Sequence, residues 1–338
     1  MSTSDLRHSV NGVPFLRSPD GNFDGLDSYP FAPNYIDFEG LRLHYVDAGA
    51  QDGPVAMLMH GMPTWSFLNR HIIHALVARG WRCIAHDHIG FGRSDKVTDR
   101  SWYSIRRHAK ACRTLIEALD LKGITLFVQD WGGPIGLAQA AEMNERFDRL
   151  VIMNTWLPHD GYVYTPAIRN WADGWKPGGL FNAGVPDRLS LGGIMMLALG
   201  HIPMSAVPDI LATGQMPPLS SEALVVKRGY DAPHHGLDAM ALAGPRRFPL
   251  SIPIDLPEDP TAVDGARHFE TLKGWTRPIH FIWGGMDGVF TPEWGRAWAA
   301  LYPQATFDLL AEAGHFVQES HGAEIARLVL QYAAARAK

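Results

Sequence analysis

Three residues that lie far apart in the chain, Asp130, Asp287 and His315, have the types that nucleophilic catalysis uses: a nucleophile, an acid and a histidine. Asp130 follows an apolar run at 126–128 and precedes Trp-Gly-Gly-Pro at 131–134, a pattern that predicts a strand, a sharp turn and a helix. This is the context of a nucleophile elbow, in which small residues relieve the crowding of backbone against backbone. An aspartate at a strand end is also an ordinary helix N-cap, so Asp130 alone does not settle the question.

The other two residues, together with a fourth motif, favour a chemical role for Asp130. His-Gly-Met-Pro at 60–63 follows another predicted strand and places the backbone N–H of Met62 in one half of an expected oxyanion hole. The N–H of Trp131 would form the other half. Asp287 follows the penultimate predicted strand and His315 follows the last one, and sites in open parallel sheets form at these carboxyl ends. The four features together predict an active site with a carboxylate nucleophile.

The elements that must position these residues alternate between short apolar runs and longer segments with helical periodicity, which predicts an α/β fold with a mostly parallel, eight-stranded sheet flanked by helices. The predicted strands are 35–38, 41–46, 55–60, 82–86, 125–129, 150–154, 279–283 and 306–309, the first two as an antiparallel hairpin. The predicted helices include 65–79, 103–119, 134–144 and 323–335.

The alternation stops near residue 157 and resumes near residue 277. The intervening segment is rich in Pro, Gly, Met and Trp and has short helical patterns without a convincing strand. Loops of this length without structure are rare in compact domains, so we interpret the segment as an inserted helical cap. The predicted organisation is a core formed by 1–156 and 269–338, with the cap at 157–268.

Composition excludes several classes of function. The net charge is −5 and Lys and Arg are scattered through the 338 residues, which predicts neither nucleic acid nor a membrane surface as a partner. The N-terminus lacks the apolar stretch of a secretory signal, so we expect a cytoplasmic protein. Sixteen histidines occur without a metal-ligand spacing, and the two cysteines, Cys83 and Cys112, do not form one either. We therefore expect no metal.

Several motifs resemble those of the haloalkane dehalogenases, members of the α/β-hydrolase superfamily, over nearly the whole length. The resemblance is carried by residues 26–31, 60–66, 90–95, 128–133, 153–154 and 313–319, and Gln-Asp-Trp-Gly-Gly at 129–133 is the most specific of these motifs. It points to the subfamily whose catalytic acid follows the penultimate strand, here Asp287. A related subfamily has its acid where this chain has Asn154, and an amide cannot stabilise an imidazolium as a carboxylate does.

The resemblance implies a two-step reaction that requires no cofactor. Asp130 would displace halide from a small, neutral haloalkane, and His315, oriented by Asp287, would then activate a water that hydrolyses the alkyl ester. In this subfamily two tryptophan indoles bind the halide product, which implies Trp131 together with Trp171 rather than Trp175. Met62 departs from the family, where Glu or Asn is usual, so any polar role of that side chain is lost while its backbone N–H remains.

Some features stay open at this stage. Composition offers Trp175, Phe181, Phe248 and Leu250 as possible substrate-pocket residues. An epoxide hydrolase with the same triad would need a cap tyrosine, and Tyr162, Tyr164 and Tyr230 are available; a fluoroacetate-type dehalogenase is disfavoured because its Arg-rich elbow is absent. A catalytically silent ligand-binding relative is the alternative outside enzymes. The chain is expected to act as a monomer or a small homo-oligomer.

Overall fold

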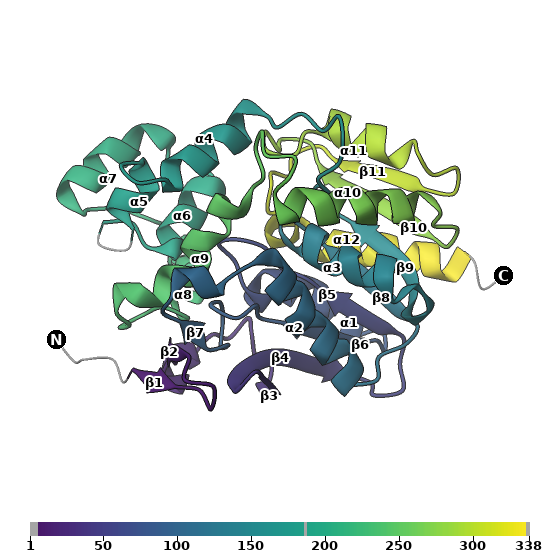
Figure 1. Ribbon diagram of the computed structural model, residues 1–338, viewed down its shortest axis with the longest axis horizontal. Coiled ribbons are helices and arrows are strands. Elements are labelled where there is room, and N and C mark those ends of the chain that lie inside the picture. Colours follow the sequence, from purple (N-terminus) through teal and green to yellow (C-terminus); the bar gives the residue numbers. More distant parts are fainter. Residues whose placement is uncertain (1–5, 186–187, 336–338) are drawn as a thin grey trace.

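A single eight-stranded sheet forms the centre of the computed structural model, which describes residues 6–185 and 188–335 (Figure 1). Its strand order is β11-β10-β9-β8-β5-β6-β4-β3. The strands are β3 (Asn34–Phe38), β4 (Leu41–Gly49), β5 (Val55–Leu58), β6 (Arg82–His86), β8 (Ile124–Val128), β9 (Phe147–Ile152), β10 (Ile279–Gly284) and β11 (Thr306–Leu310). All eight predicted strands are therefore present, with shifts of a few residues at their ends.

The sheet is parallel from β6 to β11, and antiparallel pairing is confined to its other edge, where β4 pairs with β3 and with β6. Every residue of β8 and of β10 is buried, as expected for strands covered by helices on both faces. Because β5, β8 and β10 are parallel, the loops that follow them open at the same edge of the sheet. The fold class predicted from the sequence is confirmed.

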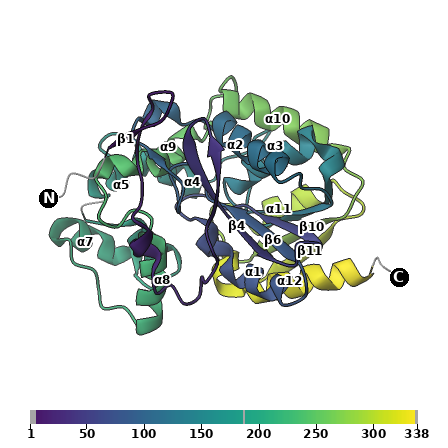
Figure 2. The same ribbon diagram turned by 90° about the horizontal axis from the view of Figure 1, so that it is seen from below.

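Helices cover both faces of the sheet (Figure 2). On one face α1 (Arg70–Val77) packs against α12 (Val317–Ala335), and on the other α3 (Gly132–Glu142) packs against α2 (Ile105–Ala118) and α10 (Pro260–Lys273). A further helix, α11 (Pro292–Ala299), lies against β10 and β11. The predicted helix 65–79 begins as a 3-10 turn, and α12 starts six residues before the predicted 323 and is interrupted at His321.

Between β9 and β10 the described residues form helices and no strand, in agreement with the pattern of the sequence. These helices are α4 (Pro166–Trp175), α5 (Leu180–Gly184), α6 (Leu191–Ala198), α7 (Val207–Thr213), α8 (Ser221–Asp231) and α9 (Ala243–Arg247), and they lie to one side of the sheet in Figure 1. The division at residues 157 and 268 stays a prediction. The second boundary falls inside α10, which packs against α3.

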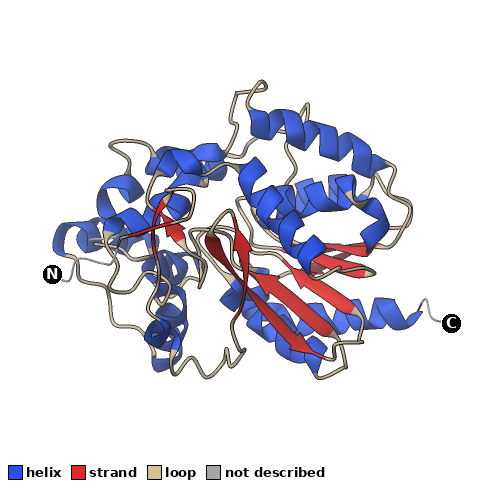
Figure 3. Ribbon diagram, turned by 60° about the horizontal axis from the view of Figure 1, so that its bottom comes forward, coloured by secondary structure: helices blue, strands red, loops and turns tan. Residues whose placement is uncertain are grey.

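Shorter elements complete the fold. A small separate sheet, visible beside the main one in Figure 3, is formed by β1 (Arg7–His8), β2 (Pro14–Leu16) and β7 (Lys96–Val97). The 3-10 turns are η1 (Asp20–Phe23), η2 (Ser66–Asn69), η3 (Arg100–Trp102), η4 (Asn144–Arg146), η5 (Met204–Ala206), η6 (Ala239–Leu242) and η7 (Pro249–Ser251). Among the described residues, no helix has both the length and the apolar character needed to cross a bilayer.

Candidate active site

Asp130 occupies a strained turn between β8 and α3. Its φ of 50° lies in the left-handed region, which non-glycine residues adopt only when their surroundings hold them there. The surroundings are three hydrogen bonds: the Asp130 N–H donates to the carbonyl of Asn154 at 3.0 Å, and the Asp130 carbonyl accepts from Gly133 N–H at 2.9 Å and from Thr155 Oγ1 at 2.5 Å. The turn is thus fixed by the neighbouring strand end and by the first turn of α3.

The loop after β5 holds one oxygen of the Asp130 carboxylate. The backbone N–H of Met62 donates to Asp130 Oδ1 at 2.8 Å. This approach needs glycine at position 61, because a Cβ there would lie 2.0 Å from the same oxygen. The Trp131 N–H has no hydrogen-bond partner within 6–185 and 188–335, so it is free to serve as a second donor.

His315 reaches the other oxygen of Asp130 and connects it to Asp287. The imidazole Nε2 lies 3.6 Å from Asp130 Oδ2, and Nδ1 lies 2.9 Å from Asp287 Oδ2. The side chains of Asp130 and His315 keep 12% and 14% of their surface exposed, while that of Asp287 keeps none. The structure therefore brings the three residues together, with His315 between the two carboxylates and with Asp130 and His315 accessible to a small molecule.

The two carboxylates change the protonation of the histidine. Burial opposes the charged form of His315, but the negative charges of Asp287 and Asp130 and the hydrogen bond to Asp287 outweigh burial and raise its pKa to about 10. The imidazole is consequently an imidazolium at neutral pH as long as both carboxylates are charged.

Asp287 is a buried carboxylate with a donor for each lone pair. Its Oδ1 accepts from the N–H groups of Val289 and Phe290, at 2.7 and 3.2 Å. Its Oδ2 accepts from Asn154 Nδ2 at 2.8 Å and faces His315 Nδ1. Four donors compensate the cost of burying the charge, and they fix the direction in which the carboxylate points.

Two amides in the site have contacts that the sequence patterns did not predict. Asn154 donates to Asp287 and is itself fixed, since its Oδ1 accepts the Gly284 N–H at 2.8 Å. Gln129 Nε2 lies 3.1 Å from both the carbonyl oxygen and Nε2 of His315. The sequence shows that Asn154 lies at a strand end and that Gln129 precedes the nucleophile. It does not show their partners, which lie in loops far away in the chain.

Trp131 lies next to Asp130, and its ring is almost fully buried against Trp156 and Phe248, at centroid distances of 4.7 and 5.5 Å. Its indole N–H has no hydrogen-bond partner among the described residues. Phe248, one of the possible substrate-pocket residues, thus packs against the ring that lies next to Asp130.

Trp171 and Trp175 lie on α4 in an aromatic group with Phe181. Trp171 contacts Trp175 and Phe181 at 5.5 and 4.9 Å, and Trp175 stacks on Phe181 at 5.5 Å. Trp175 is buried with an unpartnered indole N–H in the described structure, whereas Trp171 is half-buried. Within the described residues no ring contact joins this group to Trp131. Leu250 belongs to η7, which packs against α4.

The tyrosines that an epoxide hydrolase would need have other surroundings. Tyr230 is buried and its hydroxyl donates to Glu319 at 2.5 Å. Tyr162 and Tyr164 pack edge to face against each other, and Tyr162 also packs against Trp294. None of these tyrosines contacts Asp130 or Trp131 through a hydrogen bond or ring contact of the described residues.

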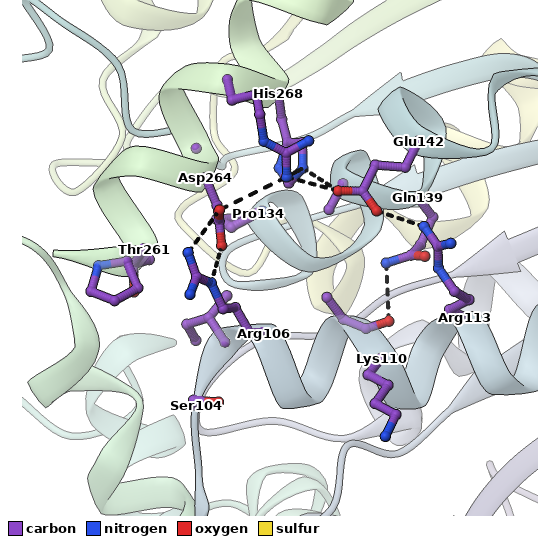
Figure 4. A pocket seen from close by; sticks show the side chains of 16 residues that line it. Ser104, Arg106, Lys110, Arg113, Pro134, Gln139, Glu142, Thr261, Asp264 and His268 are labelled. Carbon is purple, nitrogen blue, oxygen red and sulfur yellow. Dashed lines mark hydrogen bonds and ion pairs between the residues drawn. The ribbon is translucent and has the colours of Figure 1, made fainter. Parts of the chain in front are cut away.

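A cavity of about 570 Å³ lies elsewhere, between α2, α3 and α10 (Figure 4). It is lined by charged residues that pair with one another, such as Glu142 with Arg113 and with His268, and by none of the predicted site residues. Across the described part of the chain, no group of three His, Cys, Asp or Glu residues has the arrangement that could hold a metal ion.

The chain matches known proteins over most of its length. Residues 54–322 match the family model of the alpha/beta hydrolase fold. The haloalkane dehalogenase of Mycolicibacterium paratuberculosis is 36% identical over 331 residues, which are 94% of this chain and 97% of that protein. The haloalkane dehalogenase of Psychrobacter cryohalolentis is 34% identical and covers 95% of this chain and 98% of its own length.

Solved structures give the same result. The tetrameric haloalkane dehalogenase of Paraglaciecola agarilytica superposes with a TM-score of 0.79 at 31% identity, over 94% of this chain and 98% of that one.

Proposed function

We propose, since the chain belongs to the haloalkane dehalogenase family within the α/β-hydrolase fold, that it hydrolyses small haloalkanes with Asp130 as the nucleophile. The observation that carries the assignment of roles is the different surroundings of the two carboxylate oxygens of Asp130. Oδ1 accepts the Met62 N–H at 2.8 Å, whereas no hydrogen bond from a described backbone or side chain ties Oδ2, which lies 3.6 Å from His315. Oδ2 is therefore the oxygen available for attack.

In the first step, Asp130 Oδ2 forms a bond to the saturated carbon of the substrate and the carbon–halogen bond breaks, so that halide leaves with the bonding electron pair. The developing negative charge requires donors in a site with little water. The indole N–H of Trp131 is one such donor, because it lies next to Asp130 and has no hydrogen-bond partner within 6–185 and 188–335. Trp171 is proposed as the second, and Trp175 is the alternative.

In the second step, water attacks the carboxyl carbon of the ester. His315 Nε2 takes a proton from that water, and Asp287 stabilises the imidazolium that forms. The ester carbonyl oxygen becomes the oxyanion; it is Oδ1, which already lies at the Met62 N–H. Collapse of this intermediate restores the Asp130 carboxylate and releases the alcohol, which carries the second hydrogen of the water, and His315 is left as the imidazolium of the resting state.

The charge of Asp130 couples the two steps. Alkylation removes one of the two negative charges that raise the pKa of His315. The pKa of the imidazole then falls, and the ring loses its proton and becomes a base only once the ester exists. This supports the order of events, because a protonated His315 cannot activate water.

Halide release from a short bromoalkane tests the proposal. Wild-type protein is expected to release bromide and alcohol in equal amounts over many turnovers, and Asp130→Ala is expected to release neither. Wild-type protein that releases no halide from chlorinated or brominated substrates would refute the assignment.

The assembly of the protein is a separate question. The Paraglaciecola agarilytica relative is tetrameric, and we propose a small homo-oligomer for this chain as well. Light scattering after gel filtration is expected to give a mass above that of one chain, and the mass of a single chain would refute this part.

A further inference from the structure

Gln129 contacts the histidine of the site and leaves half of its own amide without a partner. It ends the buried segment before the elbow, and its side chain is fully buried. Its Nε2 lies 3.1 Å from the carbonyl oxygen of His315 and 3.1 Å from His315 Nε2. Its Oε1 is buried and has no hydrogen-bond partner among the described residues.

The carbonyl of His315 decides which end of the amide faces the imidazole. A carbonyl oxygen only accepts, so the NH₂ group of Gln129 must lie toward His315, with Oε1 pointing elsewhere. One hydrogen of the NH₂ group serves the carbonyl and leaves the second for the imidazole. Since the amide nitrogen only donates, it can hydrogen-bond Nε2 only in the form of the ring in which Nε2 carries a lone pair and the proton lies on Nδ1, toward Asp287.

We propose that Gln129 is a positioning residue for the hydrolytic step: its amide holds the neutral, Nδ1-protonated form of His315 and keeps the Nε2 lone pair directed toward the site. The proposal rests on the function proposed above. A protonated Nε2 would place two donors against each other, so Gln129 disfavours the imidazolium.

The surroundings of His315 show why such a residue is useful. The charged groups that face the imidazole are Asp287, from the loop after β10, and Asp130, from the elbow after β8, and both favour the imidazolium. Phe290 and Phe316 pack against the ring and carry no charge. Burial of the ring and the contact with Gln129 both oppose the two carboxylates, and Gln129 adds to the shift of the His315 pKa toward the neutral range in which a general base works best.

A packing role does not explain the side chain. Methionine would fill the same space without the unpartnered Oε1, so what glutamine adds at this position is the pair of contacts from Nε2 to the carbonyl and the imidazole of His315. Gln139 provides a matched control, because it is equally buried, donates through Nε2 to the carbonyls of Ala109 and Ile135, and also has an unpartnered Oε1 (Figure 4). It lies on α3 and does not contact the site.

The test compares Gln129→Met, Gln129→Glu and Gln139→Met with wild type. The rate of ester hydrolysis and the rate of halide release in a first turnover are measured from pH 5 to pH 10 by rapid quench. The hydrolysis rate should rise with pH as His315 loses its proton. In Gln129→Met the midpoint of this rise is expected to lie about half to one pH unit higher than in wild type, which corresponds to the free energy of one neutral hydrogen bond. The first-turnover halide release should change less than about twofold.

Gln129→Glu should shift the profile further in the same direction, because a carboxylate accepts from the imidazolium and stabilises it. Its alkyl ester should accumulate at neutral pH, visible as one added alkyl mass on the intact protein. The Gln139→Met profile should coincide with that of wild type, and thermal melting of all variants identifies a variant that has lost its fold.

Two results overturn the inference: a Gln129→Met profile that coincides with that of Gln139→Met, or equal losses in both steps at every pH, as a merely structural residue would give. If Gln129→Met does not fold, the direction of the shift in Gln129→Glu decides. These results can be distinguished from a failure of the proposed function itself, because wild-type protein would then release no halide and no ester would form at Asp130.

Discussion

The side-chain amide of Asn154 donates to Oδ2 of Asp287 at 2.8 Å, the same oxygen that faces Nδ1 of His315 at 2.9 Å. The ends of β9 and β10 therefore meet at one carboxylate oxygen, the one that contacts the histidine. The amide is oriented by the Gly284 N–H, so its NH₂ group can only face the carboxylate. In this chain the carboxylate that contacts the imidazole follows β10, and the amide at the end of β9 lies beside it.

Asp287→Asn is expected to lower the rate of ester hydrolysis by about 10⁴-fold, by analogy with the acid of a serine triad, because an amide cannot stabilise the imidazolium. Adding Asn154→Asp should restore part of the rate, since the new carboxylate starts next to position 287. Steady-state turnover of a bromoalkane measures both effects. Asp264→Asn, an ion-paired residue on α10 outside the site, is the control. A near-normal rate in Asp287→Asn would show that another group orients His315.

The halide donors are tested by paired substitutions on α4. Each lost indole donor should weaken halide stabilisation by about 1.5–3 kcal/mol, which affects chloride more than bromide because bromide is the better leaving group. Trp171→Phe should therefore reduce chloroalkane turnover about 10- to 100-fold and bromoalkane turnover less. Trp175→Phe should leave both nearly unchanged. The reverse behaviour would identify Trp175, whose buried indole N–H has no partner among the residues that the structure describes, as the donor.

The raised pKa of His315 predicts how stability depends on pH. The folded protein keeps the imidazole proton up to about pH 10, whereas the unfolded chain loses it near pH 6.5. The stabilisation is therefore complete below pH 6.5 and is lost as pH rises toward 10. In urea unfolding, the free-energy difference between wild type and His315→Phe should shrink by about 1 kcal/mol or more from pH 6 to pH 10. A difference that is constant with pH would contradict the protonated resting state.

The sheet and the order of the functional motifs could be predicted because their signals are local. Apolar runs, the glycines after Asp130 and the His-Gly-Met-Pro turn each lie within a few residues of sequence. The contacts of Asn154 and Gln129 could not be predicted, since each depends on how loops separated by more than 100 residues meet. The small β1-β2-β7 sheet has strands of two or three residues, too short for periodicity to reveal.

The second halide donor could not be assigned from the sequence for a different reason. The sequence suggested two tryptophans one helical turn apart, and the structure puts both in one aromatic group with Phe181. Packing and halide binding favour the same residue type at such positions. Only a measurement on the two variants separates them.

The central claim is that Asp130 becomes covalently alkylated, and His315→Phe tests it most directly. This variant keeps the nucleophile and lacks the base, so a bromoalkane should add one alkyl mass per chain, together with one equivalent of bromide. Peptide mapping should place the added mass on Asp130, and Asp130→Ala in the same background should show none. An adduct on another residue, or no adduct under conditions in which wild type turns over, would contradict the account.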